Sequence, residues 1–272
     1  MKARYLALTV AAAAVVFLGV QTKVSANHSW GGYHWARSSN PVQLQIGDNV
    51  DSSWDAYFVQ AISDWDQPSG GYEDVLDLTA VPGTTRTRQC KADTGEIEVC
   101  NDSYGYTGWL GVAGISVSGD HINSAYVKLN DSYYSSPTYN TPAWRALVVC
   151  QEIGHAFGLD HQDENFNNAN LGTCMDYTND PSTNQHPNNH DYEELGIIYN
   201  HLDGGGGGGG TCHGRFCRGG VPANVDMGDP REWGRVVETD GQGRPILYMR
   251  DFGNGNKFFT HIYPVPDGPR NR

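Results

Sequence analysis

Basic side chains are scarce in this sequence. Lys and Arg together number 18, against 31 Asp and Glu, so the chain of 272 residues carries a net charge of −13. Proteins that bind the phosphates of nucleic acid need clustered Lys and Arg, so we expect no nucleic-acid partner. An acidic balance is compatible with a soluble protein and indicates nothing more specific.

Long apolar runs are missing after the N-terminus. Lys2 and Arg4 precede the apolar run Leu6–Val20, and Val24–Ala26 then offers a small-residue cleavage site. This order is typical of a secretory signal, and the run is short for a membrane span of roughly 20 residues. We therefore predict a signal peptide over residues 1–26, with a membrane anchor as the less favoured alternative. Its removal takes away three basic residues and changes the net charge from −13 to −16, leaving a secreted, extracellular protein with no membrane partner.

Cysteine spacings that suit a standard cysteine zinc site are also missing. In an exported protein, six cysteines are expected to form disulfides, and free buried thiols are the alternative. Sequence proximity favours two pairs and leaves a third, which gives Cys90–Cys100, Cys212–Cys217 and Cys150–Cys174.

The apolar periodicity alternates between strand and helix. Helical spacing covers 54–65, 142–158 and a last stretch from Asn189 or His190, and Thr141 with Pro142 begins the second of these helices. The aromatic residues of the first helix are expected in the core. Strands are predicted at 42–46, 75–81, 96–100, 109–117 and 125–129. This order predicts an α+β fold, with a mixed sheet flanked by the first two helices and a C-terminal helix after them.

Seven consecutive glycines at 204–210 indicate a flexible linker and a domain boundary. We expect one domain over 27–203. The tail at 211–272 has few apolar residues, and it predicts only a small hairpin from 244–248 and 257–263. No function is assigned to this tail.

The sequence VVCQEIGHAFGLDH, Val148–His161, contains the main candidate site. Gln151 and His155 are one helical turn apart on the same face. Gly158 permits a sharp turn that brings His161 back towards them. A catalytic zinc ion needs three protein ligands and one open position for water. These residues predict a Zn²⁺ site formed by Gln151, His155 and His161, with Glu152 as the general base that activates the zinc-bound water.

The stretch ExxHxxGxxH, followed by CMDY, resembles the metzincin clan of zinc endopeptidases. The resemblance covers roughly 42–201 and implies a metzincin-like fold of the matrixin and astacin kind. Met175 matches the methionine turn beneath the metal, and Tyr177 matches a tyrosine that assists the oxyanion. The segment WLGVAGISV at 109–117 is placed like the strand that binds the substrate as an added β-strand. The implied function is a secreted, monomeric zinc metalloendopeptidase that hydrolyses a protein or peptide substrate.

This sequence departs from the family at Gln151, where the family has a histidine. An amide oxygen is neutral and is a poorer zinc donor than imidazole. Three interpretations stay open: Gln151 ligates zinc, or another histidine (His28, His186 or His190) fills the gap, or the metal site is weak and the protein is a catalytically inactive binding protein. A neutral ligand would also leave zinc more electrophilic.

Further candidates favour simpler interpretations. His28 and His34 lie in an aromatic-rich segment that we expect to pack on the core. Asp163, Glu164 and Asn165 are calcium-type ligands, although a solvated acidic loop is the favoured interpretation.

The first predicted strand follows the predicted signal peptide almost at once, so we expect no long inhibitory propeptide between them. If the enzyme is made latent, the tail is a candidate, because Cys212 or Cys217 could block zinc if unpaired, although a small disulfide loop is favoured.

Overall fold

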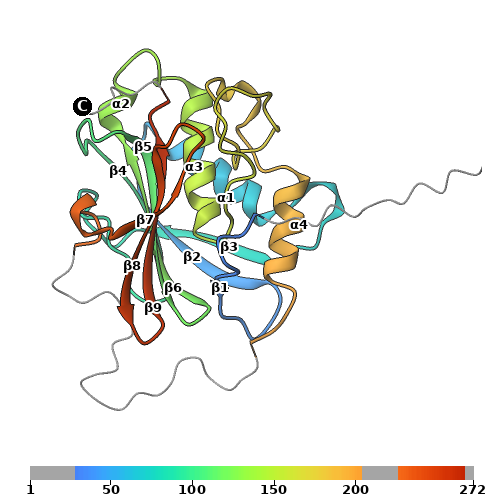
Figure 1. Ribbon diagram of the computed structural model, residues 1–272. Helices are drawn as coiled ribbons and strands as arrows, with labels where there is room; N and C mark the ends of the chain where they lie inside the picture. Colours follow the sequence, from blue (N-terminus) through green and yellow to red (C-terminus); the bar gives the residue numbers. More distant parts are fainter. Residues whose placement is uncertain (1–27, 204–225, 267–272) are drawn as a thin grey trace, which may run out of the picture.

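The fold is α+β, with one large mixed sheet and helices packed on it (Figure 1). The computed structural model describes residues 28–203 and 226–266. Within these ranges the chain forms nine strands and four α-helices. The predicted signal peptide, the glycine linker, Cys212 and Cys217 lie outside the described residues.

The elements follow one another in the order that the periodicity predicts. The helices are α1 (Asp55–Asp66), α2 (Asp131–Tyr134), α3 (Pro142–His155) and α4 (Asn189–Ile198). The strands are β1 (His34–Trp35), β2 (Val42–Asn49), β3 (Leu76–Pro82), β4 (Ile97–Asp102), β5 (Trp109–Ser118), β6 (His121–Asn130), β7 (Arg235–Thr239), β8 (Pro245–Gly253) and β9 (Asn256–Pro264). The five predicted strands and three predicted helices are confirmed, whereas β1, β7 and the short helix α2 were not predicted. Helix α3 ends at His155, three residues before the expected end, and turns follow it.

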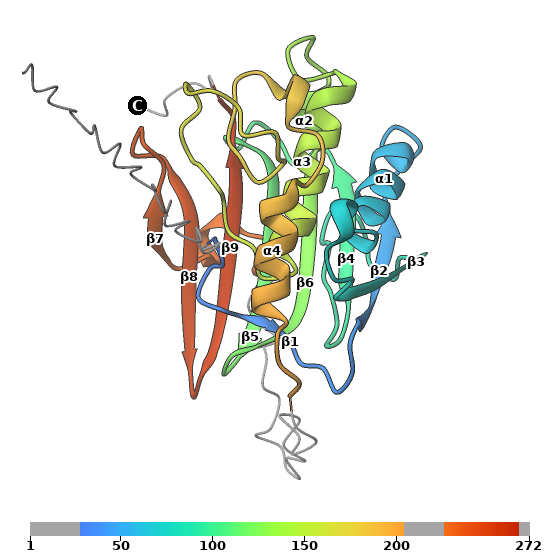
Figure 2. The same cartoon turned by 90° about the vertical axis from the view of Figure 1, so that its right-hand side faces the viewer.

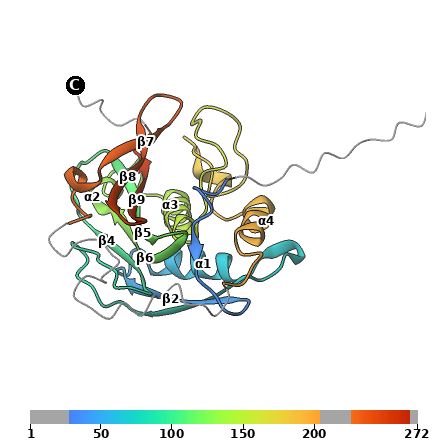
Figure 3. The same cartoon turned by 60° about the horizontal axis from the view of Figure 1, so that its bottom comes forward.

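The sheet runs in the order β3-β2-β4-β6-β5-β9-β8-β7, and β1 pairs beside it with β6. The strands β3, β2, β4 and β6 are parallel to one another, and β5 runs antiparallel to β6. On its other side β5 pairs antiparallel with β9, and the expected hairpin in the tail is present as β8 and β9. Figure 3 shows β7, β8 and β9 continuing the sheet beyond β5. The described part of the tail therefore belongs to the same sheet.

The two faces of the sheet bury different apolar groups. Helices α1, α3 and α4 lie on one face (Figures 1 and 2), where α1 packs against α3. The aromatic residues of the first helical segment join this core as predicted, through Trp54, Phe58 and Trp65. The opposite face has a smaller cluster formed by Cys90, Cys100, Trp109, Val112, Tyr126, Met227, Trp233, Phe258 and Ile262. Both faces are covered because successive side chains of a strand alternate between them.

Two disulfides tie the described residues together, Cys90–Cys100 and Cys150–Cys174. Both pairs were predicted. The second connects α3 to the loop that contains Met175. Disulfides of this kind are compatible with an oxidising compartment. Across the described ranges, no helix is both long and apolar enough to cross a membrane.

The glycines of β5 allow close packing on its two faces. A Cβ atom on Gly111 would lie 2.6 Å from Val148 Cγ1 and 2.7 Å from Glu152 Oε1 of α3. A Cβ atom on Gly114 would lie 2.3 Å from the Tyr126 ring. Side chains of α3 and of Tyr126 in β6 therefore occupy the space that the glycines leave free. Gly111 thus sets the distance at which α3 lies on the sheet.

We expect Gly111→Ala to destabilise the protein by about 1–3 kcal/mol, because the new methyl group overpacks a buried contact with α3. Gly196→Ala is the matched control. Gly196 lies inside α4, and its Cβ would meet no atom within 4 Å. This control should be neutral or stabilising by up to about 1 kcal/mol. Denaturant unfolding measures both changes, and equal stability of the two variants would contradict the packing argument.

Candidate metal centre

Helix α3 positions three of the predicted residues. It begins as the sequence predicts, with the Thr141 side chain accepting a hydrogen bond from the Trp144 N–H and with proline in the first turn. Gln151, Glu152 and His155 are all fully buried, with exposed fractions of 0%. Burying such polar groups is costly unless they find partners, so this end of α3 has a composition that packing alone does not explain.

The aromatic N-terminal segment closes the end of α3. The Trp30 indole N–H donates to the His155 carbonyl at 3.2 Å, and the Trp35 indole N–H donates to the Ala156 carbonyl at 2.8 Å. The last carbonyls of a helix have no partner within the helix, and these two tryptophans supply donors. The segment packs on the core, as expected.

A sharp turn then returns the chain to the helix. Gly158 has φ +101°, and a Cβ atom there would lie 2.2 Å from the Tyr33 carbonyl oxygen, so only glycine fits. His161 follows, and its ring centroid lies 4.7 Å from that of His155. The predicted return of His161 towards the helix is present.

The amide of Gln151 has a defined orientation. Its Nε2 donates to the Cys174 carbonyl at 2.7 Å, and Cys174 is itself held to α3 by the disulfide with Cys150. A carbonyl oxygen only accepts, so the amide nitrogen must face Cys174 and the Oε1 atom must face away. Among the described residues this buried Oε1 has no hydrogen-bond partner. The Oε1 atom is therefore available as a metal ligand.

His155 has one nitrogen held and one free. Its Nδ1–H donates to the Leu159 carbonyl at 2.8 Å, which places the lone pair on Nε2. Within the described part of the chain this Nε2 has no partner, and neither ring nitrogen of His161 makes a hydrogen bond. A carbonyl that fixes the tautomer in this way is the usual second interaction of a metal-binding histidine.

Burial sets the charges of these groups. It lowers the pKa of His161 to about 3 and the pKa of His155 well below its usual range, so both rings are neutral at pH 7. Burial likewise raises the pKa of the Glu152 carboxyl well above its usual range. The backbone N–H groups of Tyr263 and Ala113 oppose this rise, although neither makes a hydrogen bond of standard geometry with the carboxyl. Two neutral imidazoles and an amide oxygen fit a divalent cation, whose charge would favour the ionised form of Glu152.

The loop beneath the helix contains Met175 and Tyr177, both buried. A Cβ atom on Gly154 would lie 2.7 Å from Met175 Sδ, so the methionine packs directly against α3. The Tyr177 ring packs on His161, with centroids 4.3 Å apart. The structure thus brings both residues to the motif helix. Their roles in catalysis stay predictions.

Strand β9 of the tail also reaches this centre, which the sequence did not predict. The His261 ring stacks on His155, with centroids 4.1 Å apart and an interplanar angle of 18°. Neither nitrogen of His261 has a hydrogen-bond partner in the described residues. The Tyr177 hydroxyl donates to the Ile262 carbonyl at 2.7 Å. A single histidine in a strand-like stretch 100 residues after His161 offers no local signal of this contact.

The other histidines considered for the third ligand have different partners. His28 Nε2 lies 3.1 Å from Asp191 Oδ1, and the His28 ring stacks on His190 with centroids 4.7 Å apart. His186 Nδ1 lies 2.7 Å from Asp64 Oδ2. Among His28, His186, His190 and His261, His261 is the one with a ring contact to both His155 and His161.

The described residues contain two groups of three acidic or histidine side chains whose ligand atoms lie within 4.8 Å of one another. One is Asp160, His161 and Glu164, at the edge of the motif. The other is His34, His121 and Asp203, at a separate place in the fold. Side-chain groupings that could bind a metal are therefore present. Asp163 and Asn165 of the suggested calcium loop instead bond to each other, through the Asp163 Oδ1 atom and the Asn165 N–H at 2.6 Å.

Comparisons with known proteins add no family to this picture. The chain matches no protein-family model, and none of the curated proteins is significantly similar to it.

Proposed function

We propose that the protein is a secreted zinc endopeptidase whose metal is held by Gln151, His155 and His161. The observation that carries the proposal is the set of buried donor atoms on and beside α3, the Gln151 Oε1, the His155 Nε2 and the His161 nitrogens, which no described residue satisfies. Leaving such atoms without a partner costs about 1–3 kcal/mol each. A bound metal ion would remove that cost.

The roles of the chain's own residues follow from their positions. A bound zinc ion supplies Lewis-acid chemistry at a peptide carbonyl. Glu152 takes the proton of the attacking water and passes it to the leaving amine. Tyr177 donates its hydroxyl hydrogen to the carbonyl oxygen as negative charge develops there. The disulfide between Cys150 and Cys174 holds the Gln151 amide in place.

The position of strand β9 supports a further part of the proposal. It pairs antiparallel with β5, in the position of an added strand. The peptide bond between Ile262 and Tyr263 has its carbonyl on the Tyr177 hydroxyl, and its N–H faces the Glu152 carboxyl. These are the two groups to which we assign the carbonyl oxygen and the leaving nitrogen. We therefore propose that β9 occupies the substrate path and keeps the enzyme latent.

The Tyr263 side chain indicates which substrates fit. Its ring lies 5.0 Å from that of Tyr177 and 6.1 Å from that of Trp144, and its hydroxyl lies 3.3 Å from the Thr178 carbonyl oxygen. An aromatic-lined space with a polar end suits a tyrosine. The proposal is that substrates have an aromatic residue directly after the cleaved bond.

The second candidate is a binding protein with a metzincin-like fold and no catalysis. It is favoured by the presence of Gln151 in place of the histidine and by β9, which covers the catalytic groups. Glu152 and Tyr177 argue for the enzyme, because a pure binding protein needs neither.

The metal assignment makes a direct prediction. The zinc affinity of the purified protein should fall by at least about 10- to 100-fold in Gln151→Ala, because the loss of a direct ligand costs no less than the loss of a residue that orients one. Glu152→Gln should keep the zinc and lose most peptide cleavage, because the base is gone. Competition with a chromophoric chelator measures zinc affinity, and a quenched fluorescent peptide measures cleavage.

Cleavage should be measured in the wild type and in Tyr263→Ala, a variant designed to release β9 from the site, so that latency is not mistaken for inactivity. Gln60→Ala is the matched control for Gln151→Ala, because Gln60 is an exposed amide of α1 bonded to Asp64 at 2.7 Å. Zinc binding that is unaffected by Gln151→Ala contradicts the ligand set, and cleavage that survives Glu152→Gln contradicts the mechanism.

A pH–rate profile unchanged by Gln151→His would count against the idea that the neutral amide makes zinc more electrophilic.

Release of β9 should raise activity. Tyr263→Ala removes a fully buried anchor, and truncation of a buried aromatic side chain costs about 3–5 kcal/mol. If the covered form dominates, cleavage by the full chain should rise on the order of 100-fold. Tyr248→Ala is the control, since Tyr248 lies on the neighbouring strand β8 against Trp233 and outside the site. Equal activity of the wild type and both variants, with circular dichroism showing intact folds, would rule out latency through β9.

A further inference from the structure

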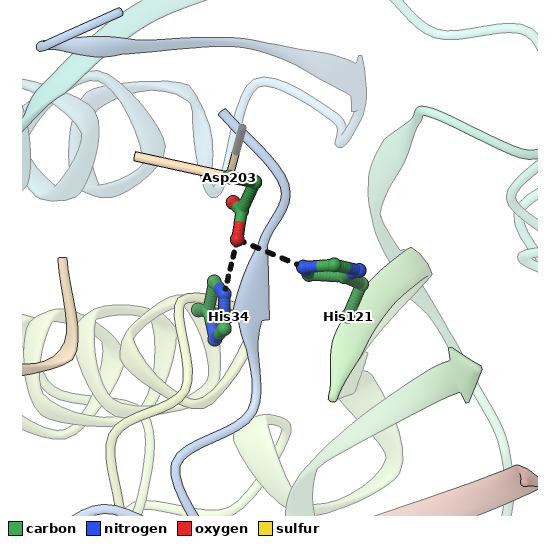
Figure 4. Close-up of side chains that lie close together, drawn as sticks. All are labelled: His34, His121 and Asp203. Atoms are coloured by element: carbon green, nitrogen blue, oxygen red, sulfur yellow. Dashed lines mark hydrogen bonds and ion pairs between the residues drawn. The ribbon is translucent and has the colours of Figure 1, made fainter. Parts of the chain in front are cut away.

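A second cluster of metal-type ligands lies away from α3, at the opposite end of β6. The His34 Nε2 lies 3.4 Å from Asp203 Oδ1, and the His121 Nε2 lies 3.1 Å from the same oxygen (Figure 4). His201 adds a fourth group, with its Nε2 3.2 Å from the His34 Nε2 and 3.5 Å from Asp203 Oδ1. Three imidazole nitrogens thus approach one carboxylate oxygen.

Strand pairing and backbone contacts bring these residues together. The parallel pairing of β1 with β6 aligns His34 directly with His121. Asp203 comes from the chain after α4, and its N–H donates to the Arg37 carbonyl at 2.8 Å. The Arg37 N–H in turn donates to Asp203 Oδ2 at 2.8 Å, which leaves Oδ1 to face the histidines. The Arg37 guanidinium holds the His201 carbonyl at 2.9 Å.

The hydrogen bonds at the rear of the rings place lone pairs at the centre of the cluster. The His34 Nδ1–H donates to the Gly32 carbonyl at 3.0 Å, so the neutral ring presents a lone pair at Nε2. The His201 Nδ1 lies 3.3 Å from Asn200 Oδ1, an acceptor, which places its lone pair at Nε2 as well. Both lone pairs face each other and the oxygen of Asp203. Acceptors so arranged repel one another unless a metal ion or a proton lies between them.

The carboxylate supplies the negative charge. A carboxyl group of ordinary acidity is ionised at pH 7.

The spacing of the ligand atoms also suits a metal. Tetrahedral zinc binds nitrogen and carboxylate oxygen at about 2.0–2.1 Å, which puts neighbouring ligand atoms about 3.3 Å apart. The four separations given above, 3.1, 3.2, 3.4 and 3.5 Å, lie around that value. The ligand atoms of His34, His121 and Asp203 all lie within 4.8 Å of one another, and His201 joins this group through its approach to His34 and Asp203. Imidazole with one carboxylate is a ligand set for zinc or a similar transition-metal ion rather than for calcium.

We propose that His34, His121, His201 and Asp203 form a second, structural zinc site, separate from the centre on α3. Four protein ligands leave no open position, so the ion stabilises the fold and does not take part in catalysis. The site ties the segment after α4 to β1 and β6, just before the glycine run that begins at residue 204. The proposal does not depend on the peptidase function.

The test counts zinc in the full chain. If both sites bind, the wild type should hold two zinc ions per chain after dialysis, and His121→Ala and Asp203→Asn should each hold one. The count should fall to one in a His155→Ala/His161→Ala background, and adding His121→Ala there should abolish it. A chain whose α3 centre binds nothing would still lose one ion in His121→Ala, so the two proposals fail separately. Mass spectrometry of the native protein and elemental analysis give the counts.

Stability provides a readout besides metal content. Removal of zinc by EDTA should lower the melting temperature of the His155→Ala/His161→Ala protein on the order of 10 °C, as expected for a ligand present far above its dissociation constant. This EDTA effect should disappear when His121→Ala is added. The control is His186→Ala, since His186 is also paired with a carboxylate, that of Asp64 at 2.7 Å, but lies outside the cluster.

The inference is overturned if His121→Ala and Asp203→Asn keep the zinc count and the EDTA response of the parent protein. A cluster held by protonated histidines alone would give that result. Should His121→Ala fail to fold, His121→Phe tests the same ligand with a ring that has no donor atom for zinc. The His121 side chain is 27% exposed, so a substitution at this position is expected to leave the core intact.

Discussion

The ladder between β5 and β9 is the interaction on which the arrangement of this protein depends. It joins the two described ranges into one sheet, and it brings His261, Ile262 and Tyr263 to the buried end of α3. Without it, β5 would be an edge strand whose backbone groups are free for a peptide. The same ladder explains why the proposed catalytic groups are buried, and it links the question of activity to the question of whether β9 can leave.

The chemistry of α3 and the position of β9 support one account together. Gln151 has its nitrogen on Cys174 and its oxygen free, and His155 has its Nδ1 held and its Nε2 free. These atoms suit a metal, and the peptide bond before Tyr263 lies between the Tyr177 hydroxyl and the Glu152 carboxyl. The proposed enzyme would therefore be inhibited by its own chain.

Most of the regular structure could be predicted, because each element has a strong local signal. Thr141 and Pro142 predicted the start of α3 correctly. The two described disulfides join the cysteines that sequence proximity and elimination had paired. The end of α3 was placed three residues late, because Ala156, Phe157 and Gly158 form turns whose N–H groups bond three residues back instead of continuing the α-helix. Strands β1 and β7 were missed because β1 has only two residues and β7 is mostly exposed at the rim of the sheet.

The motif on α3 is local, so the sequence by itself determined which residues of that helix share a face and where the chain turns back with His161. It also determined the charge of the chain and the probable partners of its cysteines. Only the tertiary structure decided that His261 lies against His155, and that His34, His121, His201 and Asp203 meet. The reason is that these contacts join strands and loops far apart in the chain. Their register depends on sheet pairing, for which a single sequence contains no local signal.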